Sequence, residues 1–228
     1  MRLLAFDTAG PAIAAVAVEA GVPRAWYDEQ LGRGHAERLL PLLSDLLAEA
    51  RWSWRDVEVV AVGTGPGNFT GIRAGLAVAR ALGLALGCRC LGVSSLALLA
   101  ESAAGMASGH GPIDAVIDAR RDEIYAQRFD GDLLPATEPL LVPAAAFAEI
   151  LPGPGILVGD AAADLSRSAR RGDPAMLGAR DSLTLARLAG RQLERGEAAA
   201  PAGTIRPTYV RSPDARPDAG ASLIPAGR

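Results

Sequence analysis

The sequence predicts an α/β protein whose sheets contain both parallel and antiparallel strands. Three short apolar runs come first, and helical and strand patterns alternate after them. A Gly/Pro-rich segment at 106–112 separates this half from a second one that repeats the order of elements in abbreviated form. We therefore expect two lobes, at 1–109 and 110–211, and a disordered tail at 212–228.

The first half begins with a meander of three strands and a leucine-rich helix. Strands are expected where apolar runs lie between turn-forming residues. The helix is expected because its leucines recur at helical spacing, and Pro41 should bend it by removing one backbone hydrogen bond. These four elements are expected at 3–7, 12–18, 24–31 and 36–50.

The remainder of the first half alternates strands and helices. A buried-type strand at 57–62 leads into a glycine-rich turn, and a second apolar helix follows to about Leu86 with Thr70 as its N-cap. Another strand, at 90–93, precedes a helix that Ser94 or Ser95 should cap. A three-strand meander followed by such an alternation is the ribonuclease H-like order, which gives a mixed sheet covered on both faces.

The second half repeats this order with shorter elements. Two paired strands and a third precede a short helix, a strand and a leucine-rich helix. The repeat is one of topology, because the residues of the two halves are barely alike. The expected ranges are 113–119, 123–129, 136–142, 144–151, 155–158 and 182–195.

Composition excludes several classes of protein. Half of the 228 residues are hydrophobic and 21% are charged, which is typical of a chain that folds around a core. A net charge of −3 argues against a protein that chiefly grips a phosphate backbone. All 23 basic residues are arginine, which excludes a Walker A lysine, a Schiff base and a serine–lysine dyad.

The cysteines and the apolar segments indicate a cytoplasmic location. Cys88 and Cys90 are too close in a strand to form an ordinary disulfide with each other. Asp7 and Gly10-Pro11 interrupt the apolar start, which argues against a signal peptide. No uninterrupted apolar run reaches the length of about 18 residues that a membrane helix requires, so we expect no membrane helix.

A glycine-rich turn at 63–71 is the strongest local motif. Its backbone amides and the following helix N-terminus could cradle phosphate, although it matches neither established phosphate-loop pattern and a plain tight turn is favoured. An acid at each of two matching strand ends would suit a nucleotide cleft between the lobes, although a strand-ending acid usually serves a turn. The candidate residues of this vestigial cleft are Asp7, Thr8, Gly65, Gly67, Asn68 and Asp118.

The two long helices of the first half carry more apolar and small surface than one sheet face should bury. Gly71, Gly75, Ala79 and Gly83 form a ridge of small side chains, which could pack on the chain's own sheet or on another helix. We expect both helices to form one exposed seam for a partner. The predicted contacts are His35, Leu39, Leu42, Leu43, Leu46, Leu47, Ile72, Arg73, Leu76, Ala79, Arg80 and Gly83.

No metal site or catalytic triad is predicted. His35 and His110 are far apart and lack neighbours at metal-ligand spacing, and His35 is expected to be a capping or surface contact. The serines lie in caps and loops without a nucleophile-elbow pattern, so we expect no catalytic residues.

Several segments together resemble the TsaB (YeaZ) family. The resemblance is strong over residues 1–130 and returns in a C-terminal strand motif, while 131–205 match only in general architecture. The segments that carry it are 4–8, 35–41, 65–73, 92–96, 117–120, 123–125 and 207–211.

The resemblance implies an actin-like (ASKHA) fold of two ribonuclease H-like lobes and a non-catalytic paralogue of the transferase TsaD. In that family the subunit pairs with TsaD through a helical bundle and works with the ATPase TsaE in threonylcarbamoyladenosine (t6A) synthesis on tRNA. Ser95 and Leu99 occupy the places of the metal-binding histidines of TsaD, and they cannot repeat that chemistry. No cofactor is expected, tRNA is contacted only through the complex, and the chain alone should self-associate as a homodimer.

Two other functions stay open. An ASKHA-type ATPase or small-molecule kinase would use Asp7, the glycine-rich turn and Asp118, and steady ATP turnover abolished by Asp7→Asn would indicate it. A metallopeptidase is the third, and the missing histidine pair disfavours it.

Overall fold

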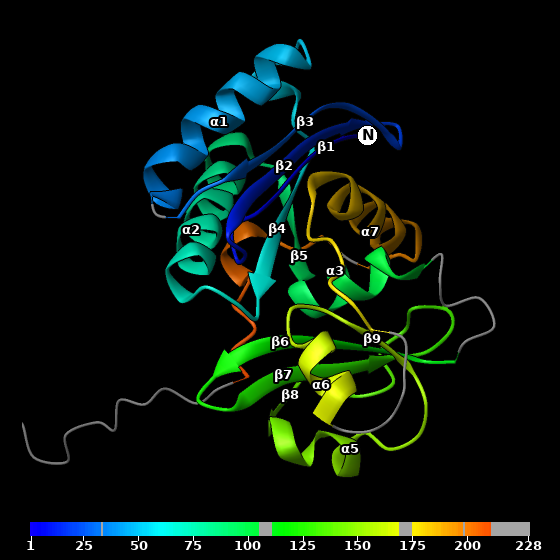
Figure 1. Ribbon diagram of the computed structural model, residues 1–228. Coiled ribbons are helices and arrows are strands. Elements are labelled where there is room, and N and C mark those ends of the chain that lie inside the picture. The colour runs from blue at the N-terminus through cyan, green and yellow to red at the C-terminus, as the bar shows by residue number, and fades with distance from the viewer. Residues whose placement is uncertain (33, 105–110, 169–174, 198, 211–228) are drawn as a thin grey trace, which may run out of the picture.

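The computed structural model describes residues 1–32, 34–104, 111–168, 175–197 and 199–210. They form two five-stranded sheets, one in each lobe (Figure 1). The strands are β1 (Arg2–Asp7), β2 (Ala12–Glu19), β3 (Val22–Gln30), β4 (Val59–Gly65), β5 (Arg89–Ser94), β6 (Ile113–Arg120), β7 (Glu123–Phe129), β8 (Leu140–Pro143), β9 (Ile156–Val158) and β10 (Ala175–Met176). The α-helices are α1 (His35–Glu49), α2 (Phe69–Leu86), α3 (Ser95–Ser102), α5 (Phe147–Ile150), α6 (Ala162–Ser168) and α7 (Ser182–Glu194), and short 3-10 turns lie at Trp54–Asp56, Ala144–Ala146 and Ala202–Thr204.

The two sheets have the same topology. The first runs β3-β2-β1-β4-β5, and the second, read from β8, runs β8-β7-β6-β9-β10. In each sheet the central strand, β1 or β6, is antiparallel to the neighbour that follows it in sequence, β2 or β7. It is parallel to its neighbour on the other side, β4 or β9. The predicted actin-like fold of two ribonuclease H-like lobes with an abbreviated second lobe is therefore confirmed.

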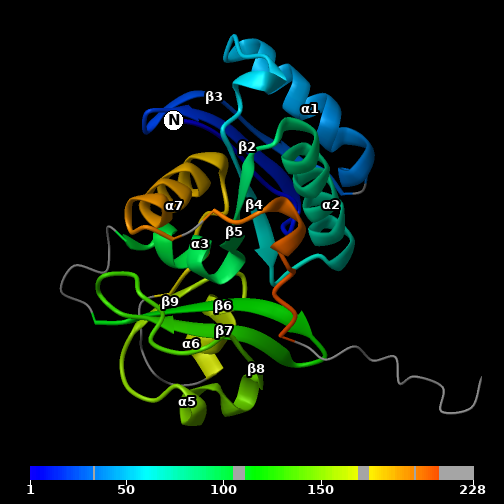
Figure 2. The same cartoon turned by 180° about the vertical axis from the view of Figure 1, so that it is seen from behind.

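Helices cover both faces of the first sheet (Figures 1 and 2). Side chains alternate along a strand, so Leu4 and Phe6 of β1 face α1 and α2, while Leu3 and Ala5 face α7. The α1 leucines at the predicted helical spacing are buried against the first of these faces. Burial of apolar side chains on both sides makes this sheet the main core of the protein.

Helix α3 lies between the lobes. Leu98 packs with the first sheet, while Leu96 and Leu99 pack against β6 of the second. The far face of the second sheet is covered by α5 and α6 through Phe147 and Leu165. A single helix therefore serves both cores, which ties the lobes together.

The structure corrects the predicted lobe boundary. Helix α7 was expected in the second lobe, but Leu185 and Leu188 pack with Leu3 and other residues on the first sheet. At the start of α7, the backbone N–H and the hydroxyl of Ser182 donate to Asp28 of β3 at 2.8 and 2.7 Å. The chain returns to the first lobe because β1 and β2 are apolar on both faces of the sheet. Helices α1 and α2 cover one face, and the first half of the chain does not supply enough apolar surface to cover the other.

Several predicted boundaries shift. Asn68, not Thr70, is the N-cap of α2, and its side chain accepts a hydrogen bond from the Gly71 N–H at 3.1 Å. Ser94 caps α3, as expected. The third strand of the second sheet, expected at 136–142, is β8, and α6 and β10 were not predicted. The tail at 212–228 and His110 lie outside the described residues.

Helix α2 carries Arg73 and Arg80, so it does not contradict the expectation that no uninterrupted apolar run reaches membrane length. Within the described part of the chain, it is long and apolar enough to cross a membrane by length and composition alone. Its Ile72 and Leu76 are buried against the first sheet, and the core helix of a soluble protein passes the same test.

Candidate functional site

Asp7 ends β1 at the base of the space between the lobes. The side chain is 3% exposed, and its Oδ1 accepts a hydrogen bond from the Ala9 N–H at 2.9 Å. Gly63 of β4 makes room for it, because any Cβ at that position would overlap the carboxylate. Burial raises the pKa of Asp7, while the Ala9 N–H and the nearby Arg180 guanidinium oppose that rise. The bond to Ala9 agrees with the turn-forming interpretation.

The ridge of small residues on α2 packs inside the protein. The Thr8 hydroxyl donates to the Gly71 carbonyl at 2.7 Å, and a Cβ on Gly75 would lie 2.5 Å from the Thr8 oxygen. At the other end, a Cβ on Gly83 would lie 2.8 Å from the Cys90 sulfur. Of the two alternatives for this ridge, packing on the chain's own sheet is therefore correct.

The glycine-rich turn is clamped to the turn between β1 and β2. Gly67 has a φ of +156°, and a Cβ on it would overlap the Ala9 carbonyl. The Asn68 N–H donates to the same carbonyl at 2.8 Å, and the Gly71 N–H is taken by the Asn68 side chain. Two amides that a phosphate would need are thus already bonded within the protein.

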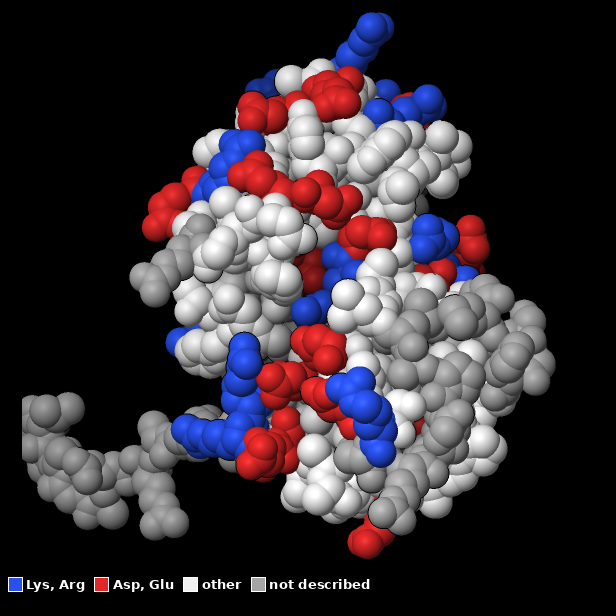
Figure 3. Space-filling model, viewed as in Figure 1, with Lys and Arg blue, Asp and Glu red and all other residues white. Residues whose placement is uncertain are grey.

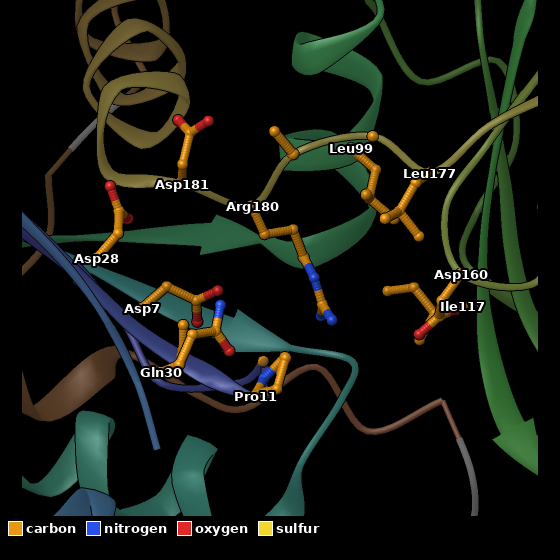
Figure 4. A pocket seen from close by; sticks show the side chains of 14 residues that line it. Asp7, Pro11, Asp28, Gln30, Leu99, Ile117, Asp160, Leu177, Arg180 and Asp181 are labelled. Carbon is orange, nitrogen blue, oxygen red and sulfur yellow. The ribbon is translucent and has the colours of Figure 1, made fainter. Parts of the chain in front are cut away.

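Two adjoining cavities open between the lobes. One, of about 340 Å³, is lined by Asp7 and Asp28 of the first lobe and by Asp160 of the second. The other, of about 490 Å³, is lined by Gly67, Asn68 and Asp118 among others. Figure 4 shows the Arg180 side chain directed into the first cavity between Asp7 and Asp160. The structure therefore gathers Asp7, Gly67, Asn68 and Asp118 around one cleft, while Thr8 and Gly65 do not line it.

Carboxylates outnumber cations in this cleft, and Figure 3 shows charged side chains gathered at the hollow between the lobes. Arg120 pairs with Asp118 at 3.2 Å, which leaves Arg180 to face the remaining acids. This charge disfavours a bare phosphate. Among the described residues, no cluster of three His, Cys, Asp or Glu could hold a metal ion. The acids lining the cleft are Asp7, Asp28, Asp118, Asp160 and Asp181.

His35 is not the capping or surface contact that the sequence predicted. It is 7% exposed, and its Nε2 has no hydrogen-bond partner among the described residues. The N-cap of α1 is Gly34, with a φ of 88° and no side-chain cap. His35 instead forms part of the wall of the second cavity.

Most of the predicted partner contacts are buried in the chain's own core. The sheet face in front of α1 and α2 is wide enough to take both apolar stripes, so these residues are buried and are not available to a partner. Arg80 is half-buried and donates to the Ile205 carbonyl, whereas Arg73 is exposed as expected. The buried contacts are His35, Leu39, Leu42, Leu43, Leu46, Leu47, Ile72, Leu76, Ala79 and Gly83.

The outer side of α2 is exposed and largely apolar, and α1 adds the exposed Leu40, although its other exposed residues include Glu37, Asp45 and Glu49. Leu84 of α2 is 85% exposed, Phe69 is 53% exposed and Leu40 of α1 is 47% exposed. Alanines fill the exposed turns of α2 between Phe69 and Leu84. We call Leu40, Phe69, Arg73, Ala77, Ala81, Leu84 and Ala85 the two-helix face.

Comparison with known proteins identifies the family. Residues 28–166 match the family described as "TsaD: tRNA N6-adenosine threonylcarbamoyltransferase". The solved structure of YeaZ from Pseudomonas aeruginosa has a TM-score of 0.75 and 31% identity, over 91% of this chain and 99% of that one. The chain belongs to the TsaB (YeaZ) family.

Two relatives define how far the similarity reaches. The chain is 36% identical over 132 residues to the tRNA threonylcarbamoyladenosine biosynthesis protein TsaB of Escherichia coli, which is 58% of this chain and 56% of the relative. It is 37% identical over 225 residues to the uncharacterized protein Rv3421c of Mycobacterium tuberculosis, 94% of each. The match thus spans about half the length of the curated TsaB proteins and nearly all of the mycobacterial protein.

In this TsaB-family chain, sequence reasoning missed two groups of residues. Asp160 and Arg180 line the cleft, and each follows a strand of the short second sheet. The internal repeat of strand order could have indicated Asp160, because that residue stands just after the end of its strand. Leu84 falls on the outer side of α2, away from the apolar stripe, and this departure was the available indication of an exposed contact surface. Leu40 widens the leucine stripe of α1, and the sequence did not show that it would be 47% exposed.

Proposed function

We propose that this chain is a non-catalytic partner subunit in t6A biosynthesis on tRNA, and that it binds a TsaD-like transferase through the two-helix face. Its family relatives in three bacteria are named for tRNA threonylcarbamoyladenosine biosynthesis. A TsaE-like ATPase and tRNA join through the resulting complex, in the cytoplasm that the unpaired cysteines favour.

The observation that carries this proposal is the exposed side of α2. An outer helix face is ordinarily polar, yet this one presents alanines and a leucine that is 85% exposed. Small side chains let a second helix approach closely, and α1 and α2 contact each other, so both can meet the same partner. Two helices from each subunit would form a four-helix bundle. The same face, meeting a second copy of itself, would give the homodimer of the isolated chain.

The cleft supports a role without catalysis of its own. Amides of the glycine-rich turn bond within the protein, and carboxylates outnumber cations around Asp7. The absence of lysine removes a common phosphate-binding group.

The direct test is Leu84→Glu. Because Leu84 is 85% exposed, this change should leave the fold intact and place a charge at an apolar contact, which weakens affinity for the TsaD-like subunit at least about tenfold. Leu134→Glu, at a leucine of the second lobe that is 45% exposed, is the matched control and should bind normally. Calorimetry with both folded variants measures the difference.

A reconstitution tests the reaction itself. The chain alone should form no t6A on tRNA, and it should restore modification when added to TsaD-like and TsaE-like subunits and the enzyme that makes the threonylcarbamoyl adenylate. Modification by this chain without the TsaD-like subunit would overturn the proposal. Steady ATP turnover that Asp7→Asn abolishes would support the kinase or ATPase alternative instead.

A further inference from the structure

We infer that the C-terminal segment 205–210 belongs to the partner-binding face, where Tyr209, Arg73 and Phe69 together anchor the TsaD-like subunit. This inference rests on the proposed function and extends the binding face beyond the two helices. It assigns a role to a segment more than a hundred residues away from α2 along the chain.

The three side chains form one cluster. The guanidinium carbon of Arg73 lies 3.8 Å from the centre of the Phe69 ring. The Arg73 Nε donates to the Tyr209 hydroxyl at 3.3 Å, and the two aromatic rings are 6.1 Å apart. Arg73 is therefore held by both aromatic residues, and it loses less side-chain entropy on binding than a free arginine would.

The cluster is anchored to the first lobe through the backbone. The Thr208 N–H donates to the Thr64 carbonyl at 2.9 Å, and the two threonine hydroxyls are 3.0 Å apart. Ile205 is 7% exposed within the first-lobe core, and its carbonyl accepts from Arg80. Tyr209 is thus presented by a fixed segment rather than by a free chain end.

The cluster leaves aromatic surface unburied. Phe69 and Tyr209 are each 53% exposed, although a ring gains most by full burial. Tyr and Arg are the residue types that most often dominate the energy of protein interfaces. Covering this cluster with a partner would remove apolar surface from water around an arginine that is already positioned.

The cluster continues the two-helix face. Phe69, Arg73, Ala77 and Ala81 follow at intervals of four on α2, so the cluster stands at one end of the exposed stripe and Leu84 near the other. From residue 69 to residue 84 the helix rises about 22 Å, which is four turns of a partner helix. A partner that covers Leu84 along this stripe reaches Arg73, where it should place a carboxylate.

Single-stranded RNA can also stack on exposed aromatic rings beside arginine. The rest of the stripe argues for protein, because Ala77 and Ala81 continue it, and the other arginine of α2, Arg80, is half-buried and donates to the Ile205 carbonyl. Binding of tRNA is therefore an outcome to be tested and not the proposal.

The experiment measures binding of the TsaD-like subunit to Arg73→Ala and Tyr209→Ala by calorimetry, after melting curves confirm folding. Each variant should weaken affinity about tenfold, and Tyr209→Phe, which removes only the hydroxyl bond, should weaken it less. The double variant should lose less than the product of the two single losses, because the residues act together. Arg167→Ala, at an exposed arginine of α6 in the second lobe, is the control and should bind normally.

Three results would overturn the inference in different ways. Normal affinity of Arg73→Ala and Tyr209→Ala, with loss of binding by Leu84→Glu, would place the segment outside the interface and leave the proposed function standing. Normal affinity of Leu84→Glu as well would remove the proposed face itself. Loss of tRNA binding by the isolated variants, without loss of the protein partner, would assign the cluster to RNA.

Discussion

The two lobes share one topology but differ in the side chains of one buried pair between neighbouring strands. Four residues before Asp7 on β1 stands Leu3, which pairs across the sheet with Val18. Four residues before Asp118 on β6 stands Asp114, which pairs across the sheet with Arg128. Leu3 and Asp114 are 1% and 0% exposed, so one topology holds either an apolar pair or an ion pair at the same buried place.

The ion pair is acceptable because its partners are complete. Arg128 grips Asp114 with two hydrogen bonds of 2.7 and 2.8 Å and also donates to the Pro152 carbonyl at 2.7 Å. A buried charge without a partner would cost several kcal/mol, whereas a bidentate pair offsets most of that cost. Topology therefore does not dictate whether a core position is apolar or charged, but the two residues that pair across the strands must change together.

The strand ends show the same contrast. Asp7 and Asp118 each accept a hydrogen bond from the backbone N–H two residues later, at 2.9 and 2.8 Å. The Asp118 side chain is 44% exposed, whereas Asp7 is buried against Gly63, where the glycine-rich turn begins. The turn that joins β6 to β7, at Arg120 to Asp122, corresponds to the turn between β1 and β2. It has positive φ angles and no such cover. The two acids that the sequence paired are thus in unequal environments.

The largest effect is expected from breaking the ion pair of the second lobe. Asp114→Ala should lower the free energy of unfolding by about 3–5 kcal/mol, because Arg128 would stay buried without its carboxylate. Replacing both residues by the first-lobe pair, as Asp114→Leu with Arg128→Val, should recover more than half of that loss. Urea unfolding measures both. A double variant as unstable as the single one would mean that the second lobe requires the charges.

A smaller effect is expected at the glycine-rich turn of the first lobe. Gly67→Val should cost about 1–3 kcal/mol, since a side chain there meets the Ala9 carbonyl at a φ that favours glycine. Gly131→Val in the second lobe, where a Cβ would meet nothing within 4 Å, should change stability by less than about 0.5 kcal/mol. Thermal melting compares the two variants. Equal losses would contradict the clamped geometry of the first turn.

The smallest effect concerns pH. Burial raises the folded-state pKa of Asp7, so the folded protein binds a proton more tightly than the unfolded chain does. The contribution of Asp7 to stability is therefore most favourable below its unfolded pKa, and it falls as pH rises through the raised folded value. Asp7→Asn keeps an acceptor for the Ala9 N–H and should make stability less dependent on pH across that window, while also raising it at neutral pH.

Asp118→Asn is the control for this comparison. It makes the same change at the matching strand end of the second lobe, where the side chain is 44% exposed rather than buried. Melting temperatures between pH 4 and 8 would show the difference, and identical pH profiles for all three proteins would contradict the burial of Asp7. Partner-dependent t6A formation should be retained in Asp7→Asn if the acid has only a structural role.

Sequence periodicity was enough to predict most of the elements and their order, although it missed α6 and β10. Leucines at helical spacing predicted α1, apolar runs predicted the strands, and their sequence predicted the ribonuclease H-like lobes that the structure contains. Local chemistry was less complete, since Asn68 rather than Thr70 caps α2. A cap depends on where the first turn begins, and the clamp on Ala9 fixes that start here.

What covers each face was decided only by the tertiary structure. An apolar stripe such as Leu39 to Leu47 shows that a helix must be buried, but a partner and the chain's own sheet satisfy that need equally. The same holds for α7, which follows the second lobe in sequence but packs on the first sheet, because the face with Leu3 and Ala5 needs an apolar cover. Hydrophobic burial has no direction along the chain, so the sequence by itself determined which surfaces are apolar, while the three-dimensional packing decided that Leu46 is core and Leu84 is surface.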